Sequence, residues 1–118
     1  MLISRTKKFA IDCWFLCDNL PNSREYNAYV NQLIRCSSSV GANYRSAQRA
    51  KSTADFINKL KIVEEEADES QYFLELLLEI EKINQKNTSE IEILIMEADE
   101  LVSIMVSAIK TARNNLKS

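Results

Sequence analysis

The chain has a single glycine, Gly41, and a single proline, Pro21, among its 118 residues. Hairpins, tight turns and phosphate-binding loops need glycine at positions with positive φ, so one glycine is too few for a sheet or a Gly-rich loop. Helix interiors disfavour both residues, and a chain that nearly lacks them can be helical over most of its length. This scarcity predicts an all-α fold.

Histidine is absent from the sequence altogether. Histidine is the usual general base near neutral pH, a common zinc ligand and the activating partner of serine and cysteine nucleophiles. A catalytic role would need the carboxylates of residues 64–69 to hold Mg²⁺, and a solvated acidic face explains that run better. We therefore expect a protein that is not an enzyme and has neither a metal nor another cofactor.

Apolar residues recur every three or four positions along four segments, the spacing of an amphipathic helix. The expected helices are residues 4–19, 24–50, 53–85 and 89–115. Four such helices with short connections predict one domain over residues 1–118, an antiparallel up-down-up-down four-helix bundle.

Breaker and capping residues separate these segments. Pro21 ends the first, Asn22 or Ser23 can cap the second, Ser52 with Asp55 restarts the third, and Ser89 with Glu92 forms a capping box for the fourth. Charged side chains interrupt the apolar residues of the first 20 positions, so neither a signal peptide nor a membrane span is expected. The three cysteines suit a reducing cytoplasm and small core-facing side chains.

The third expected helix carries a second apolar stripe beside its main one. A bundle helix buries about a third of its circumference, and a wider apolar arc favours a partner. Self-association is the favoured interpretation, and an irregular, widened core is the alternative. The expected oligomer interface consists of Trp14 on the first helix and of Phe73, Leu76 and Ile80 on the third.

Charge is distributed unevenly, although the net charge is only −2. Residues 35–61 hold six bases and one acid, residues 62–100 two bases and thirteen acids, and residues 101–118 three bases and no acid. Basic side chains with an aromatic among them can hold phosphates and stack on a base. The expected nucleic-acid-binding residues are Arg35, Tyr44, Arg45, Arg49 and Lys51.

The alternative is that these cations pair with the acidic run 64–69, within the bundle or across a subunit boundary. Opposite charges on two sides of an interface steer and orient its assembly. A sequence pI near 5.2 is not typical of a general nucleic-acid-binding protein.

Residues 35–44 place three serines, a glycine and an asparagine inside a helix, where all are weak helix formers. Small residues allow a neighbouring helix to approach closely, and a buried asparagine needs hydrogen-bond partners. If these residues faced solvent beside Arg35 and Arg45, they would instead suit a phosphate. The expected polar network consists of Ser39, Asn43, Glu65 and Glu69.

Residues 32–47 have the sequence QLIRCSSSVGANYRSA, followed by DFINKL at 55–60 and IVEEEADES at 62–70. These segments closely resemble the 23S rRNA-intervening sequence proteins, the S23 family, and the resemblance extends over nearly the whole chain. The R-x-x-x-S-x-x-x-N pattern of the family falls on Arg35, Ser39 and Asn43. Its pattern of an aromatic, a basic residue and glutamates falls on Phe56, Lys59, Glu65 and Glu69.

The resemblance implies a bacterial, cytoplasmic four-helix bundle that assembles into a ring-like homopentamer and has no established enzymatic activity. The chain is more distantly similar to the accessory variability proteins of diversity-generating retroelements, a basic branch that binds nucleic acid and a reverse transcriptase. Two hypotheses follow. The chain is a non-enzymatic homo-oligomeric scaffold that binds RNA or a nucleic-acid-processing protein, or it is a protein–protein interaction scaffold whose basic end is buried in subunit contacts.

Overall fold

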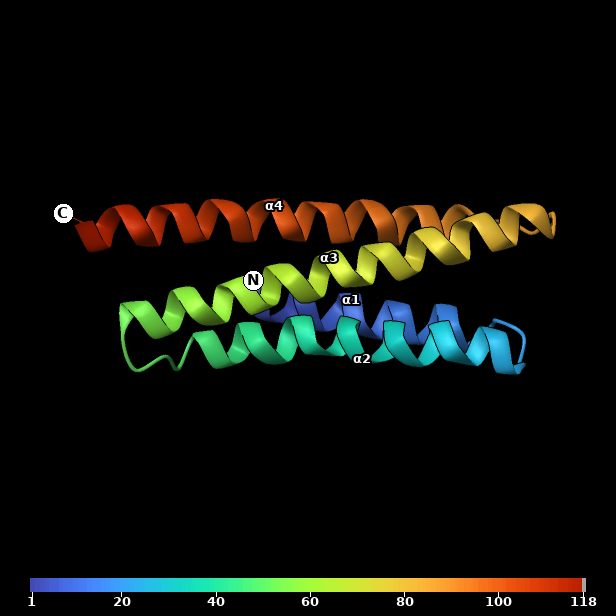
Figure 1. Cartoon of the computed structure of the whole chain (residues 1–118), viewed down its shortest axis with the longest axis horizontal. Helices are drawn as coiled ribbons and strands as arrows, with labels where there is room; N and C mark the ends of the chain where they lie inside the picture. The colour runs from blue at the N-terminus through green and yellow to red at the C-terminus, as the bar shows by residue number, and fades with distance from the viewer. Residues whose placement is uncertain (118) are drawn as a thin grey trace.

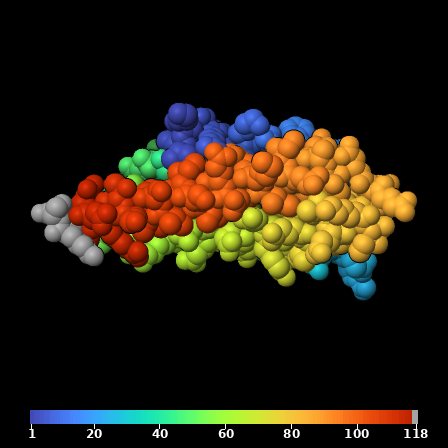
Figure 2. Space-filling view, turned by 90° about the horizontal axis from the view of Figure 1, so that it is seen from above, coloured from blue at the N-terminus to red at the C-terminus, as the bar shows by residue number. Residues whose placement is uncertain are grey.

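Four helices make up the described part of the chain. The computed structural model describes residues 1–117, with side chains up to Leu116. The helices are α1 (Leu2–Asp18), α2 (Arg24–Ala47), α3 (Thr53–Ile83) and α4 (Ser89–Lys117). They lie along one long axis, in a rod of 53 × 22 × 19 Å (Figures 1 and 2). The predicted all-α fold is confirmed.

Contacts between the helices show that neighbours run in opposite directions. Tyr26 near the start of α2 donates a hydrogen bond to Glu81 near the end of α3. Arg5 at the start of α1 binds Glu97 of α4, and Leu16 near the end of α1 lines a groove with Glu90 at the start of α4. Figure 1 shows that successive helices run in opposite directions. α3 packs along α2 and α4, while α1 packs along α2 and only lightly against α4. Within the described residues α1 and α3 do not pack together, so they are diagonal in the bundle.

The predicted capping residues start two of the helices. The Ser23 hydroxyl accepts the backbone N–H of Tyr26 at 3.2 Å, and the Ser52 hydroxyl accepts that of Asp55 at 3.1 Å. The Asp55 carboxylate in turn accepts the backbone N–H of Lys51 at 3.0 Å. These bonds satisfy N–H groups that a helix start leaves without a partner.

The start of α4 differs from the predicted capping box. Ser89 is the first helical residue, and both its backbone N–H and its hydroxyl donate to the side-chain oxygen of Asn87. Glu92 accepts a hydrogen bond from the hydroxyl of Thr88 at 3.1 Å. The pairing of Ser89 with Glu92 was therefore wrong by one residue, because Thr88 occupies the position in front of the helix.

The core is a single cluster to which all four helices contribute apolar side chains. Fully burying one such side chain stabilises the fold by about 1.5–3 kcal/mol. At Gly41 a Cβ would lie 3.3 Å from the Thr6 hydroxyl, so glycine permits the close approach of α1 and α2. No helix among residues 1–117 combines the length and apolar character needed to cross a membrane. Large, fully buried members of the core include Phe9, Leu33, Leu60, Leu74, Leu77 and Leu101.

The three cysteines are buried in this core and form no disulfide. Burial raises the pKa of Cys13 and Cys36, and raises the pKa of Cys17 to about 11. A thiol with a raised pKa stays protonated and unreactive at neutral pH. The cysteines act here as small apolar side chains.

Candidate nucleic-acid interface

The connection between α2 and α3 exposes two of the predicted cations. α2 ends at Ala47, three residues before the predicted end at Ala50, and the chain then forms tight turns. The backbone N–H of Lys51 donates to the Asp55 carboxylate of α3. α2 therefore does not continue through Lys51. As a result the Arg49 and Lys51 side chains are exposed at the tip of the bundle.

The last turns of α4 return to this same tip. The C-terminal end of α4 and the α2–α3 connection lie at the same end of the rod (Figure 1). The described parts of the two basic segments, residues 35–61 and 101–117, therefore reach the same end of the rod although they are far apart in the chain. We call the exposed cations gathered there the basic end: Arg45, Arg49, Lys51, Lys61, Lys110 and Arg113.

None of these six side chains forms an ion pair with another residue among residues 1–117. The one acid in the two basic segments, Asp55, is already engaged by the Lys51 backbone N–H and by the Lys59 ammonium at 3.2 Å. Both partners lower the pKa of Asp55. The charges of the basic end are thus available to an anion, and exposed cations attract phosphates at long range.

Arg35 belongs to a different part of the molecule. Its guanidinium binds Glu66 at 3.1 Å and also binds Glu69, both on α3. The hydrogen bond that the guanidinium donates to Glu69 is the main cause of the raised pKa of Arg35. The predicted pairing of cations with the acidic run therefore occurs for this arginine, and its charge is neutralised at the α2–α3 seam.

The structure also changes the expected roles of two residues, Tyr44 and Lys7. Tyr44 is half-buried and packs against the core. Its ring is therefore less exposed than the cations near it. Lys7, which the sequence analysis did not select, is exposed and lines a groove between α1 and α2 together with Arg45. Gly41 and Ala42 line the same groove, and their small size keeps it open.

The four residues of the predicted polar network are not joined in one network. The Asn43 amide donates to the Ser39 carbonyl and hydroxyl oxygens, both at 2.8 Å. Glu69 binds Arg35 instead, and Glu65 is exposed and has no hydrogen bond or ion pair within residues 1–117. The asparagine thus finds its partners within its own helix.

The predicted interface residues lie on two separate apolar faces. Trp14 is 50% exposed, and its ring meets the Phe15 ring edge-on at 5.1 Å between centroids. On α3 the half-buried Phe73 contacts the rings of Tyr29 and Tyr72. Because α1 and α3 are diagonal, their outer faces point away from one another. The α1 face consists of Ile11, Trp14 and Phe15, and the α3 face of Phe73, Leu76 and Ile80.

Comparison with known proteins identifies the family. The family model of the 23S rRNA-intervening sequence proteins matches residues 2–106. The chain belongs to this family. A crystal structure of an S23 ribosomal protein family member from Bacteroides thetaiotaomicron VPI-5482, described as having unknown function, is 33% identical, with a TM-score of 0.81. The match covers 93% of this chain and 99% of that one. The comparison with curated proteins found no match.

The predicted resemblance to the S23 family is thus confirmed. The sequence analysis placed the binding site of this family member on one segment of the chain. It therefore missed several residues of the basic end. The excess of three bases in residues 101–118 was a usable signal for Lys110 and Arg113, since an up-down-up-down order returns the fourth helix to the α2–α3 connection. No comparable signal exists for Lys7, because its position opposite Arg45 depends on how α1 packs on α2.

Proposed function

We propose that this S23 family member is a non-enzymatic, homo-oligomeric scaffold that binds RNA through its basic end. The observation that supports the proposal is the meeting of two basic segments at one end of the rod, where six exposed cations have no partner among residues 1–117. Neutralising phosphates with lysine and arginine releases counterions and drives binding to nucleic acid.

The site suits binding better than chemistry. The chain has no histidine, and the basic end presents charges on flexible, exposed side chains rather than a fixed set of groups in a closed pocket. Such cations hold a polyanion without orienting a reaction. The partner is RNA itself or a nucleic-acid-processing protein, and the free, buried cysteines suit a cytoplasmic location.

The two apolar faces support the proposed self-association. Trp14 and Phe15 remain about half exposed on α1, and the α3 face lies on the diagonal helix. When two different surfaces of one chain meet, the contact is heterologous, and copies close into a ring if the rotation between them permits it. A homopentamer, as implied by the family resemblance, is such a ring.

Light scattering after gel filtration tests the assembly. We expect a mass several times 13.5 kDa for the wild type, and a smaller mass for Leu76→Glu, which places a charge on the α3 face. Glu75→Gln, an exposed neighbour on the same helix, is the control and keeps the wild-type mass. A wild type of 13.5 kDa at micromolar concentration contradicts this part of the proposal.

Fluorescence anisotropy with a labelled RNA tests the binding. We expect binding that weakens steeply as salt rises, and a loss of affinity for Arg45→Ala combined with Arg49→Ala while the oligomer remains intact.

The alternative scaffold hypothesis is supported by exposed acids in the run 64–69, since Glu65 and Asp68 could receive the basic end of a second copy. Under that hypothesis the same double variant dissociates the oligomer, and the wild type does not bind RNA even at low salt.

A further inference from the structure

A buried carboxylate lies at the end of the bundle opposite to the basic end. Glu81, near the end of α3, is only 6% exposed and is the one buried acidic side chain in residues 1–117. Its Oε1 accepts a hydrogen bond from the Tyr26 hydroxyl at 2.5 Å, and the Asn84 amide donates to that hydroxyl oxygen at 3.0 Å. No Lys or Arg nitrogen of the described residues lies within 4.0 Å of Glu81. Burying a carboxylate without a cation is unfavourable.

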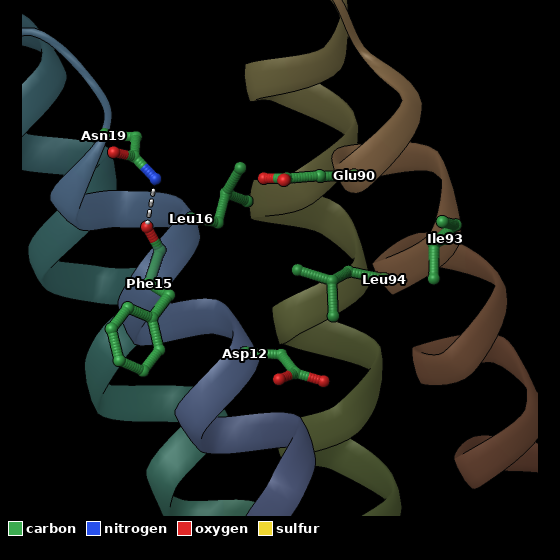
Figure 3. Close-up of a pocket in the computed structure, with 7 residues that line it drawn as sticks. All are labelled: Asp12, Phe15, Leu16, Asn19, Glu90, Ile93 and Leu94. Carbon is green, nitrogen blue, oxygen red and sulfur yellow. Dashed lines mark hydrogen bonds between the residues drawn. The ribbon is translucent and has the colours of Figure 1, made fainter.

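Glu81 lines a cavity of about 380 Å³ between the end of α1, the end of α3 and the start of α4. Leu16, Leu20 and Ile91 form its apolar walls, and Glu90 contributes a second carboxylate. The cavity continues into the groove between α1 and α4, where Leu16 and Glu90 point toward one another (Figure 3). One carboxylate is thus buried in the wall and a second is exposed at the rim.

The cavity has one cationic neighbour, Lys86, in the connection between α3 and α4. Its side chain is exposed and its nitrogen is farther than 4.0 Å from both carboxylates. The negative charge of Glu81 and Glu90 is therefore not compensated by a direct ion pair within residues 1–117.

We propose that this cavity binds a small aliphatic diamine. One ammonium group pairs with the buried Glu81, the other pairs with Glu90 at the rim, and the methylene chain packs on Leu16, Leu20 and Ile91. Pockets for small ligands combine apolar walls with a few placed polar groups in this way. A bare metal ion fits less well, because no group of three side chains in the described residues is arranged to hold one. The inference does not depend on the proposed RNA binding.

Isothermal titration of the assembled protein with 1,4-diaminobutane at constant ionic strength tests the proposal. We expect a saturable heat with one site per chain for the wild type and none with 1,4-butanediol. Glu81→Gln keeps the size of the side chain and an oxygen for the Tyr26 hydroxyl, and should weaken binding at least tenfold. Glu79→Gln, an exposed acid two residues away, is the matched control and should bind like the wild type.

A second variant guards against a folding defect in Glu81→Gln. Glu90 is exposed, so Glu90→Gln should fold normally and should weaken binding of the diamine while leaving binding of 1-aminobutane unchanged. The proposal is overturned if the wild type gives no saturable heat, or if folded Glu81→Gln binds the diamine as tightly as the wild type. It is also overturned if the wild type binds no amine and Lys86→Gln lowers the melting temperature, because Lys86 is then the counter-ion of Glu81.

Discussion

The two ends of the rod differ in whether their charged side chains are exposed or buried. At the basic end, exposed cations such as Arg49 and Arg113 remain in water without a partner among residues 1–117. At the other end, Glu81 is buried and is tied to α2 by the Tyr26 hydroxyl. A charge that stays in water costs little, whereas a buried charge needs a partner, either inside the fold or in a bound ligand. The first end is thus suited to long-range attraction, and the second to holding helices in place.

The largest expected effect is on stability at the Glu81 end. Tyr26→Phe removes the only hydrogen bond to the Glu81 carboxylate from residues 1–117 and should lower the free energy of unfolding by about 2 kcal/mol. Urea denaturation followed by circular dichroism measures this difference. Tyr72→Phe, at an exposed ring on α3, is the control. A loss no larger for Tyr26→Phe than for this control would show that the bond does not stabilise the fold.

The next effect is on RNA affinity at the basic end. Combining Arg49→Ala with Arg113→Ala should weaken binding at low salt about tenfold and reduce the slope of log K against log salt by roughly 1.4, for two phosphate contacts to a single strand. These two residues belong to segments joined only by the fold. Anisotropy titrations at several salt concentrations measure both quantities.

Arg35→Ala is the comparison variant for this measurement. Its guanidinium already binds Glu66 and Glu69, so affinity should stay within about twofold of the wild type. If Arg35→Ala lost as much RNA affinity as the double variant, ion pairing with α3 would not determine which cations bind RNA.

A smaller difference is expected at alkaline pH. The hydrogen bond to Glu81 raises the pKa of Tyr26 above its usual value near 10. Because the folded-state pKa is raised, the stabilisation is complete below pH 10 and is lost as the pH rises through the folded-state value. The difference in melting temperature between the wild type and Tyr26→Phe should therefore be constant from pH 7 to 9 and shrink above about pH 10. A difference that stays constant to pH 11.5 would contradict this.

The smallest effect is expected in acid, at the basic end. The backbone N–H of Lys51 and the Lys59 ammonium lower the pKa of Asp55. A lowered pKa in the folded state means that the stabilisation is present above about pH 4 and is lost as the pH falls through the folded-state value. Melting temperatures of the wild type and Asp55→Asn should differ slightly at pH 6 and converge below pH 4. Because Asp55 is solvated, the expected difference in melting temperature is small. A difference of several degrees at pH 6 would contradict this prediction.

The helices could be predicted because their signals are local. Spacing of apolar residues, the caps at Ser23 and Ser52 and the scarcity of glycine act over a few neighbouring residues. The errors at Ala50 and at Ser89 are shifts of one to three residues at helix ends, where several side chains compete for the same backbone groups.

The candidate site was predicted only in part. Arg49 and Lys51 were found because they follow a helix end in a basic segment, where exposure is the default. The pairing of Arg35 with α3 was foreseen only as an alternative. The position of Lys7 depends on how α1 packs on α2, whereas the basic residues of the last segment were a usable signal for Arg113 that the sequence analysis did not apply.

Short-range pattern was thus enough to predict an all-α chain with four helices in a defined order, and the resemblance of its sequence to known proteins indicated the S23 family. The roles of individual charges needed the folded arrangement. Whether an arginine is free, like Arg49, or neutralised, like Arg35, and whether a glutamate is solvated, like Glu65, or buried, like Glu81, depends on distances between residues that are far apart in the chain. Electrostatic and desolvation energies vary steeply with those distances, and composition alone does not contain them.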